Sequence, residues 1–264
     1  MPFRWWYNPD HLDLENHVKL FENPKAVSFI HELPTMLHNI RHLSNNSNPI
    51  CIRWLREHPD EIDWTTLCKQ TYPAAIRMIE SNLDRLCEKS RRVLCGNPAA
   101  VSIIRQWDPS VWSSMELSSN PSAVFLLEQF PDKINGFGLS MNPSPDAFRL
   151  MRRHSKKLYR PVLLQNTNPT VLEYLAPKFK PLKDDFYVSM NPIGIPYLLR
   201  DPNLIHVKGL SSNPNGISIL LEHQEQIDWP RACTNPALTD LIEGVDSIPP
   251  LDYSILAGNP SIFI

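Results

Sequence analysis

The sequence has few glycines, 8 in 264 residues, and no apolar run near the roughly 20 residues that a membrane-spanning helix needs. Few glycines leave few of the tight loops on which phosphate-binding sites are built. The chain has no phosphate-binding loop, no GxSxG nucleophile elbow, no dinucleotide fingerprint and no HExxH zinc motif. We therefore expect no enzyme activity, no cofactor and no contact with a membrane.

Cysteine is also sparse, and its pattern excludes a disulfide framework. The five cysteines form no CxxC pair and their number is odd: Cys51, Cys68, Cys87, Cys95 and Cys233. We expect reduced, mostly buried thiols. The first seven residues, MPFRWWY, are too short and too aromatic for a signal peptide, so we expect a protein that is not secreted.

Metal-binding patterns are missing as well. His31-Glu32 begins like HExxH, but Thr35 stands where the second histidine belongs. His38 and His42 are four residues apart and share one helix face, yet no cysteine or carboxylate accompanies them at a suitable spacing. We expect no metal site.

Proline, in contrast, is abundant, with 26 residues, and it marks a tandem repeat. The phrase LSSNPSAVFLLEQFPDKI at 117–134 returns as LSSNPNGISILLE at 210–222. Weaker copies follow one another at intervals of 22 to 25 residues, anchored at Pro24, Pro49, Pro73, Pro98, Pro121, Pro145, Pro169, Pro192, Pro214, Pro236 and Pro260. Such a period indicates stacked supersecondary units.

The Asn-Pro core of each repeat predicts a helix start. An asparagine side chain accepts from the free N–H groups of a first helical turn, and proline suits the first helical position. We expect structural caps at Asn23, Asn48, Asn97, Asn120, Asn168, Asn191, Asn213, Asn235 and Asn259. Two repeats depart from this pattern: Pro73 follows Tyr72, and Pro145 follows Ser144.

Apolar columns follow each anchoring proline. Small residues dominate two positions on, and large apolar residues stand six positions on: Ile30, Leu55, Ile79, Ile104, Leu127, Met151, Leu175, Leu198, Leu220 and Ile242. A further column stands thirteen positions on: Leu37, Ile62, Leu86, Val111, Ile134, Leu158, Leu182, Ile205 and Ile227. These spacings predict one buried stripe per helix.

We therefore predict an all-α solenoid of units of about 24 residues. Each unit has a longer helix, a corner marked by a second proline (Pro34, Pro59, Pro131, Pro202) and a short helix or 3₁₀ turn. Residues 1–22 form an N-terminal cap, and residues 23–264 form about ten repeats and a partial last one. In the first segment, Trp5 and Trp6 either cover the first repeat or dock a partner.

The repeat resembles the Asn-Pro tandem repeats, roughly LSxNPxAIxLLExNPxKIDWxxL, of many giant DNA virus proteins. The resemblance covers about residues 23–264 and weakens at Tyr72-Pro73 and near 177–185. The motif carries no known catalytic residue. It implies a viral binding protein in the cytoplasm of an infected cell or in the virion.

Charge distinguishes parts of the surface, although the net charge is only −2. Residues 141–183 hold nine Lys or Arg and two Asp or Glu, whereas residues 201–264 hold two and eight. We expect an outward basic strip formed by Arg53, Arg56, Arg77, Arg105, Arg149, Arg152, Arg153, Lys156 and Lys157. It is either a solvated face or a docking strip for an acidic protein partner. Nucleic acid and a structural role in the virion are the alternatives.

Overall fold

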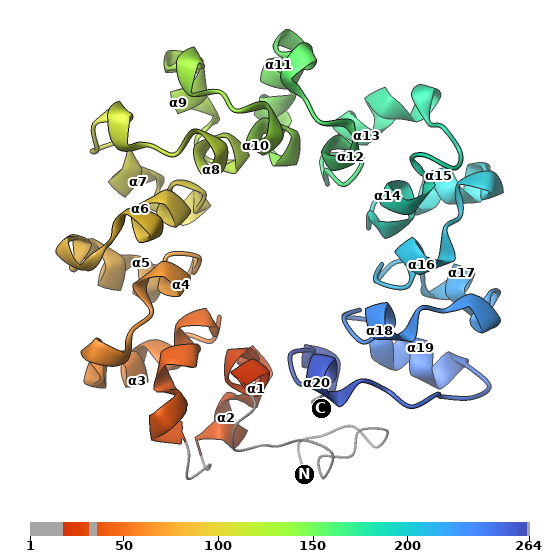
Figure 1. The fold of residues 1–264 in the computed structure, drawn as a ribbon, viewed down its shortest axis with the longest axis horizontal. Helices are drawn as coiled ribbons and strands as arrows, with labels where there is room; N and C mark the ends of the chain where they lie inside the picture. Colours follow the sequence, from red (N-terminus) through yellow and green to blue (C-terminus); the bar gives the residue numbers. More distant parts are fainter. Residues whose placement is uncertain (1–17, 32–35, 263–264) are drawn as a thin grey trace. The chain divides into compact units, whose positions relative to one another are not determined.

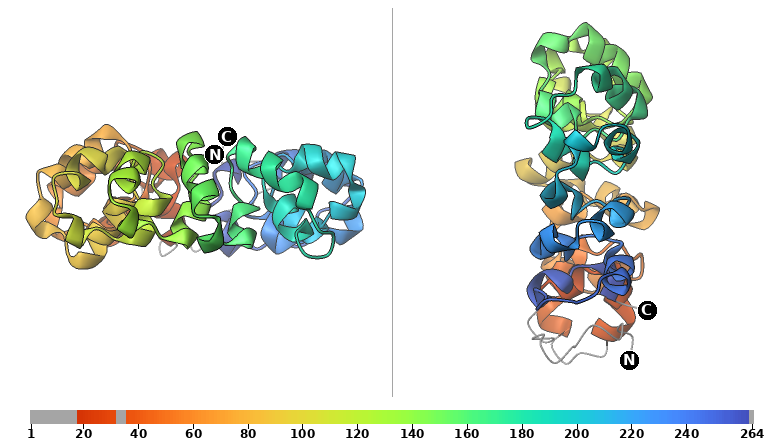
Figure 2. Two further views of the ribbon diagram at one scale, coloured as in Figure 1. Left: turned by 90° about the horizontal axis from the view of Figure 1, so that it is seen from above. Right: turned by 90° about the vertical axis from the view of Figure 1, so that its right-hand side faces the viewer.

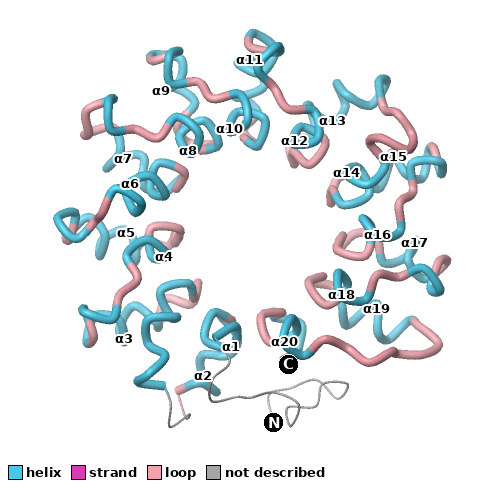
Figure 3. Tube along the Cα trace, in the orientation of Figure 1, coloured by secondary structure: helices cyan, strands magenta, loops and turns pink. Residues whose placement is uncertain are grey.

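The structure is a computed structural model that describes residues 18–31 and 36–262, with the backbone alone at 36–39. The regular elements of these residues are α and 3₁₀ helices connected by loops and turns, and these residues contain no strand (Figure 3). The predicted all-α class is therefore confirmed. None of the described helices has the length and apolar character needed to cross a membrane.

The chain forms two compact units. Unit 1 combines Met1–Asn39 with Leu172–Ile264, and unit 2 is Ile40–Val171. Unit 1 therefore combines an early and a late part of the sequence, and each unit contains several consecutive repeats (Figures 1 and 2).

Unit 2 arranges its helices in two rows (Figure 1). The row from the first half of each repeat contains α3 (Cys51–Glu57), α5 (Pro73–Glu80), α7 (Val101–Ile104), α9 (Val124–Gln129) and α11 (Pro145–Arg153). The row from the second half contains α4 (Trp64–Leu67), α6 (Glu88–Cys95), α8 (Ser114–Ser119), α10 (Gly136–Met141) and α12 (Arg160–Leu163). In the second row each helix packs against the next, so consecutive repeats bury one another's apolar stripes.

Unit 1 repeats this arrangement. Its helices are α1 (Val18–Glu22), α2 (Val27–Ile30), α14 (Asp185–Met190), α15 (Ile195–Arg200), α16 (Val207–Leu210), α17 (Ile217–Leu221), α18 (Trp229–Ala232), α19 (Leu238–Gly244) and α20 (Tyr253–Leu256). Helix α14 packs against α16, and α17 packs against α19. Helix α13 (Pro169–Leu175) and the 3₁₀ helix η3 (Met36–Asn45) contain the boundaries between the units.

Most of the described repeats have a 3₁₀ corner, as the second prolines predict, whereas a loop connects α19 to α20 in the repeat that starts at Pro236. Helices η4 (Pro59–Glu61), η8 (Pro131–Lys133) and η11 (Pro202–Leu204) begin at these prolines, whereas Pro34 lies outside the described residues. The expected division into a longer first helix and a shorter second one does not hold throughout. Helix α6, from a second half, has 8 residues, and the first-half helix α7 that follows it has 4.

The predicted core columns are largely correct. Every residue six positions after an anchoring proline, from Ile30 to Ile242, is buried. Four described members of the later column are not: Leu158 and Ile205 are half-buried, Val111 is 50% exposed and Leu182 is 90% exposed, while Leu37 lies outside the residues whose side chains are described. Trp112 is buried in place of Val111, because this repeat has one extra residue before its corner, and its indole N–H donates to the carbonyl of Ile104 at 3.0 Å. Leu182 has a φ of 66° in an exposed turn, outside the helical region.

A ladder of buried asparagines joins consecutive repeats. The side-chain amide of Asn120 donates to the carbonyl oxygens of Cys95 and Asn97, one repeat earlier, at 2.9 and 3.0 Å. Its Oδ1 accepts from the N–H of Ser122 at 2.9 Å. The same pair of donations is made by Asn97, Asn142, Asn166, Asn213, Asn235 and Asn259. The asparagine is therefore both a link between repeats and a local cap of the turn that begins at Asn-Pro. Asn23 and Asn97 are the N-caps of the 3₁₀ helices η2 (Pro24–Ala26) and η6 (Pro98–Ala100), as predicted. At Asn120 the prediction is wrong in one respect, because α9 begins only at Val124 with Ala123 as its N-cap, so Asn120 caps a turn and not the first turn of the helix.

The position of the ladder differs from the predicted caps in two repeats of unit 2. Asn142 and Asn166 form the ladder, while Ser144 and Asn168, two residues later, accept from Asp146 and Thr170 and start the following helix. Asn46 and Asn48 show the same local bonds. Asn46 Oδ1 accepts from the N–H of Asn48, and Asn48 Oδ1 accepts from the N–H of Ile50. An insertion of two residues after the ladder position therefore separates the two roles that other repeats combine.

Gln70 replaces the asparagine where the sequence motif weakens. Its amide donates to the carbonyl of Ser44 at 3.2 Å, and the hydroxyl of Tyr72 donates to the carbonyl of Asn46 at 3.5 Å. Gln70 and Tyr72 thus each donate one of the two hydrogen bonds to backbone carbonyls that a single ladder asparagine donates in other repeats.

A second column, two residues before each ladder asparagine, links each repeat to the next one. Ser118 Oγ accepts from the backbone N–H of Asn135 at 2.9 Å, and Ser140 Oγ accepts from that of Tyr159 at 3.0 Å. The equivalent bonds in other repeats are made by Ser44, Ser189 and Ser211. Cys68, Cys95 and Cys233 occupy this column, so their burial follows from replacing a structural serine.

Candidate functional site

The largest concentration of basic side chains lies on α11 and the 3₁₀ helix η9 (Ser155–Lys157) of unit 2. Proline at the first position and a bond from the N–H of Asp146 to Ser144 Oγ start α11. Its Ala147, Leu150 and Met151 are buried. The opposite face is consequently left to solvent. We call the exposed group at this face the basic strip: Arg149, Arg152, Arg153, Lys156 and Lys157.

The basic strip has little internal neutralisation. Arg149 Nη2 lies 3.9 Å from Glu128 Oε1 and 4.0 Å from Asp146 Oδ1, and all three side chains are largely exposed. No carboxylate of a described residue lies within 4.0 Å of the other four strip residues. Because exposed pairs at such distances contribute at most about 1 kcal/mol, the strip keeps most of its positive potential.

The strip rests on a rigid support. Gly136 in α10 packs so closely under η9 that a Cβ there would overlap the carbonyl oxygen of Lys157. After the strip, the ring of Tyr159 packs edge-on against Phe137 with centroids 5.4 Å apart. The N–H of Tyr159 donates to Ser140 Oγ. Backbone contacts with the preceding repeat thus fix the backbone beneath Lys156 and Lys157.

The four upstream arginines form a separate group. Arg53 and Arg56 lie on α3, Arg77 lies on α5 and Arg105 follows α7, and all four are exposed as expected. Helix α9 interrupts the series, because Phe125 and Glu128 occupy its corresponding positions. The structure therefore divides the predicted nine-residue strip into two groups. Trp5 and Trp6 lie outside the described residues.

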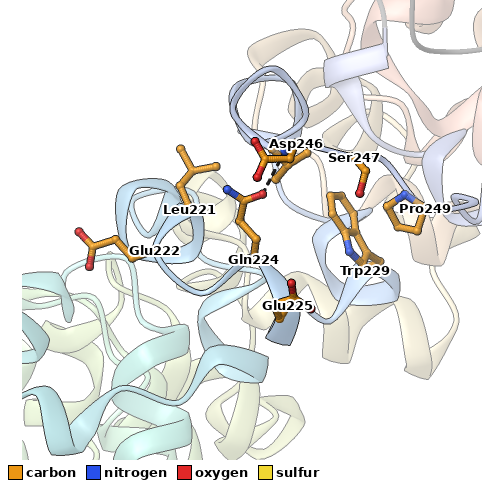
Figure 4. A pocket seen from close by; sticks show the side chains of 9 residues that line it. Leu221, Glu222, Gln224, Glu225, Trp229, Asp246, Ser247 and Pro249 are labelled. Carbon is orange, nitrogen blue, oxygen red and sulfur yellow. Dashed lines mark hydrogen bonds between the residues drawn. The ribbon is translucent and has the colours of Figure 1, made fainter.

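Unit 1 contains an open pocket lined by acidic side chains, opposite in charge to the basic strip. Its volume is about 470 Å³, and its lining includes Glu222, Glu225, Asp246 and Trp229. The N–H of Asp246 donates to Gln224 Oε1 at 3.0 Å across one side, and Trp229 lies beside Ser247 and Pro249 (Figure 4). The sequence showed the acidic composition of this region but gave no sign that the loop after α19 would form a wall.

The two aspartates that precede a tryptophan, Asp63 and Asp228, are helix caps. Asp63 Oδ1 accepts from the N–H of Thr66 and Asp228 Oδ1 accepts from that of Arg231, each at 3.1 Å. Burial alone would raise the pKa of Asp63, but hydrogen bonds from Thr66 outweigh it and lower the pKa below the ordinary 3.8. These carboxylates therefore have structural partners.

Cys87 differs from the other cysteines. Cys51, Cys68, Cys95 and Cys233 are buried, whereas Cys87 is exposed at the N-cap of α6. Hydrogen bonds from the side chain and backbone of Ser90 lower the pKa of its thiol to about 7. Burial instead raises the pKa of Cys51 to about 12. The sequence signal for Cys87 is its place at the cap position occupied by Asp63 and Asp228 in other repeats.

No protein-family model, curated protein or solved structure matches this chain. Across the described residues, no group of three or more His, Cys, Asp or Glu side chains is arranged to hold a metal ion. The candidate functional surfaces of the described residues are consequently the basic strip of unit 2 and the acidic pocket of unit 1.

Proposed function

We propose that the chain is a non-enzymatic repeat solenoid that docks an acidic protein partner on the basic strip. The observation that carries this proposal is the group of four exposed strip side chains, Arg152, Arg153, Lys156 and Lys157, without a described carboxylate within 4.0 Å. A fixed array of exposed positive charge attracts a complementary surface and accelerates its association.

The arrangement favours protein over nucleic acid as the partner. A nucleic-acid-binding domain is usually basic overall, whereas this chain carries a net charge of −2. The strip is also short, covering one helix and one 3₁₀ turn. Such a patch suits a local acidic segment of a folded protein.

The place of action follows from the sequence resemblance alone. We propose that the chain belongs with the Asn-Pro repeat proteins of giant DNA viruses and acts in the cytoplasm of an infected cell or in the virion. The support is the resemblance of the phrases at 117–134 and 210–222 to that repeat type.

A capture experiment tests the docking function. The immobilised chain is incubated with lysate of its native cell or virion, with and without nuclease, across a salt series. Carbodiimide cross-linking, which joins a lysine amine to an activated carboxylate as an amide, followed by mass spectrometry then locates the contact. We expect one dominant protein that survives nuclease, weakens with salt and cross-links to Lys156 or Lys157 through an acidic segment.

Matched charge reversals make the test specific. Arg152→Glu with Arg153→Glu changes the strip, and Arg53→Glu with Arg56→Glu makes the same change in net charge on the other side of α9. We expect at least a tenfold loss of capture from the first pair and little change from the second. Equal losses from both pairs would indicate general charge attraction. Loss of capture on nuclease treatment would instead assign the strip to nucleic acid.

A further inference from the structure

The first asparagine of the ladder pairs with the last repeat of the chain. Asn23 Nδ2 donates to the carbonyl of Ala257 at 3.2 Å. Asn259 donates in the same way to Cys233 at 2.8 Å, and Asn235 donates to Ser211 at 3.0 Å. In each case the acceptor lies two residues before the ladder asparagine of the preceding repeat. Asn23 therefore contacts the repeat of Asn259 in the same way that Asn259 contacts the repeat of Asn235.

The packing at this joint is also that of consecutive repeats. Leu20 and Phe21 on α1 are fully buried, as are Leu256 on α20 and Ile262 in η13 (Pro260–Ile262). Lys19 lies beside Gly258, since a Cβ on Gly258 would be 3.7 Å from Lys19 Cβ. Figure 1 draws α1 next to α20. We call this joint, between residues 18–30 and 253–262 of unit 1, the terminal seam.

The terminal seam differs from the other joints in one physical respect. Neighbouring repeats elsewhere are connected directly by the backbone, so their faces cannot separate far. At the seam, the two faces are connected only through the rest of the chain. Each face is apolar and matches the other, and an open repeat end needs a cover to stay soluble.

We propose that the terminal seam is an interaction surface for a second copy of this chain. When the seam opens, the first repeat of one copy docks on the last repeat of another with the same contacts. Exchange of identical elements is a low-cost route to association, and a head-to-tail contact of this kind propagates. The closed form predominates in dilute solution, because a tethered face has an effective concentration on the order of millimolar.

Engineered cysteines test both forms of the seam. In a Cys87→Ser background, which removes the exposed native thiol, Lys19→Cys and Gly258→Cys place two Cβ atoms close to the separation of about 3.8 Å that a disulfide requires. Oxidation of the double variant in dilute solution should give a cross-linked monomer that migrates faster on a non-reducing gel. Light scattering should find it monomeric at all concentrations, whereas the reduced protein associates as its concentration rises.

Mixing single variants tests whether a second copy of the chain binds at the terminal seam. Chains with only Lys19→Cys are mixed at high concentration with isotope-labelled chains carrying only Gly258→Cys, and intact mass identifies the disulfide-linked pairs. We expect Lys19→Cys to Gly258→Cys pairs to exceed like pairs several-fold. Two results would overturn the proposal: equal yields of like and unlike pairs, or a reduced protein that stays monomeric into the millimolar range. Neither result bears on the basic strip, which lies in unit 2.

Discussion

The side-chain amide of Asn120 donates to the carbonyl oxygen of Asn97 at 3.0 Å, and Asn142 donates to the carbonyl of Asn120 at the same distance. One residue type therefore connects three repeats, because the side chain of each asparagine reaches back and its carbonyl accepts from the next. This contact between repeats explains why the Asn-Pro phrase recurs. A local cap alone would not require a buried side chain, whereas Asn120 is 0% exposed.

Substitutions at Asn120 should separate the ladder from the cap. Asn120→Ala removes both, and leaves the carbonyls of Cys95 and Asn97 without these donors, which we expect to lower the free energy of unfolding by about 2–4 kcal/mol. Asn120→Asp keeps the cap acceptor but places a carboxylate against two carbonyl oxygens. It should destabilise at least as much as alanine in urea unfolding at pH 7.

The exposed Asn203 provides the control for this pair. Asn203→Ala should change the free energy of unfolding by less than about 0.5 kcal/mol. A fully stable Asn120→Asp variant would show that the side chain acts only as a cap, and would remove the physical basis for the ladder.

The sequence predicted the helical class and most of the core because proline spacing and apolar columns are local signals. The cap predicted at Asn168 is correct, and Ser144 caps α11, but the ladder asparagines of these repeats, Asn142 and Asn166, lie two residues earlier and were not predicted, since their bonds reach a different repeat. The role of Ser118 was missed because its bond to Asn135 joins different repeats. The strip residues were predicted to be exposed, as they are. The contact of Asn23 with Ala257 could not be predicted, because it joins residues more than 230 positions apart.

Glycine has a steric role where α10 approaches α8. A Cβ on Gly138 would overlap the carbonyl oxygen of Met115, a backbone atom that cannot move alone. Gly138→Ala should therefore lower the free energy of unfolding by about 3 kcal/mol or more. At Gly96 the nearest atom to an added Cβ would be 3.4 Å away, so Gly96→Ala should be neutral or stabilising by up to about 1 kcal/mol. Thermal unfolding of both variants compares them, and equal effects would refute this packing argument.

Cys87 should be the fastest of the described thiols to react at neutral pH. With its pKa lowered to about 7, it is about half thiolate at pH 7, whereas burial keeps Cys51 and Cys68 protonated. Iodoacetamide labelling of the folded protein, followed by peptide mass spectrometry, should modify Cys87 first. Ser90→Ala should slow labelling at pH 6.5 more than at pH 9, because it removes the hydrogen bond that favours the thiolate. A pH-independent effect of this variant would instead indicate altered access.

Acid should destabilise the fold through its capping carboxylates. Hydrogen bonds from Thr66 overcome the effect of burial and hold the pKa of Asp63 below 3.8, so its contribution is present above that pH and is lost as pH falls through the folded-state pKa. Asp63→Asn keeps the cap acceptor without titrating and should match the wild type closely at pH 7. Urea unfolding between pH 5 and about pH 2 should show a shallower loss of stability for Asp63→Asn, whereas Asp84→Asn, at an exposed position, should follow the wild-type curve. Parallel curves for Asp63→Asn and the wild type would mean that the hydrogen bonds to Asp63 do not favour its charged form.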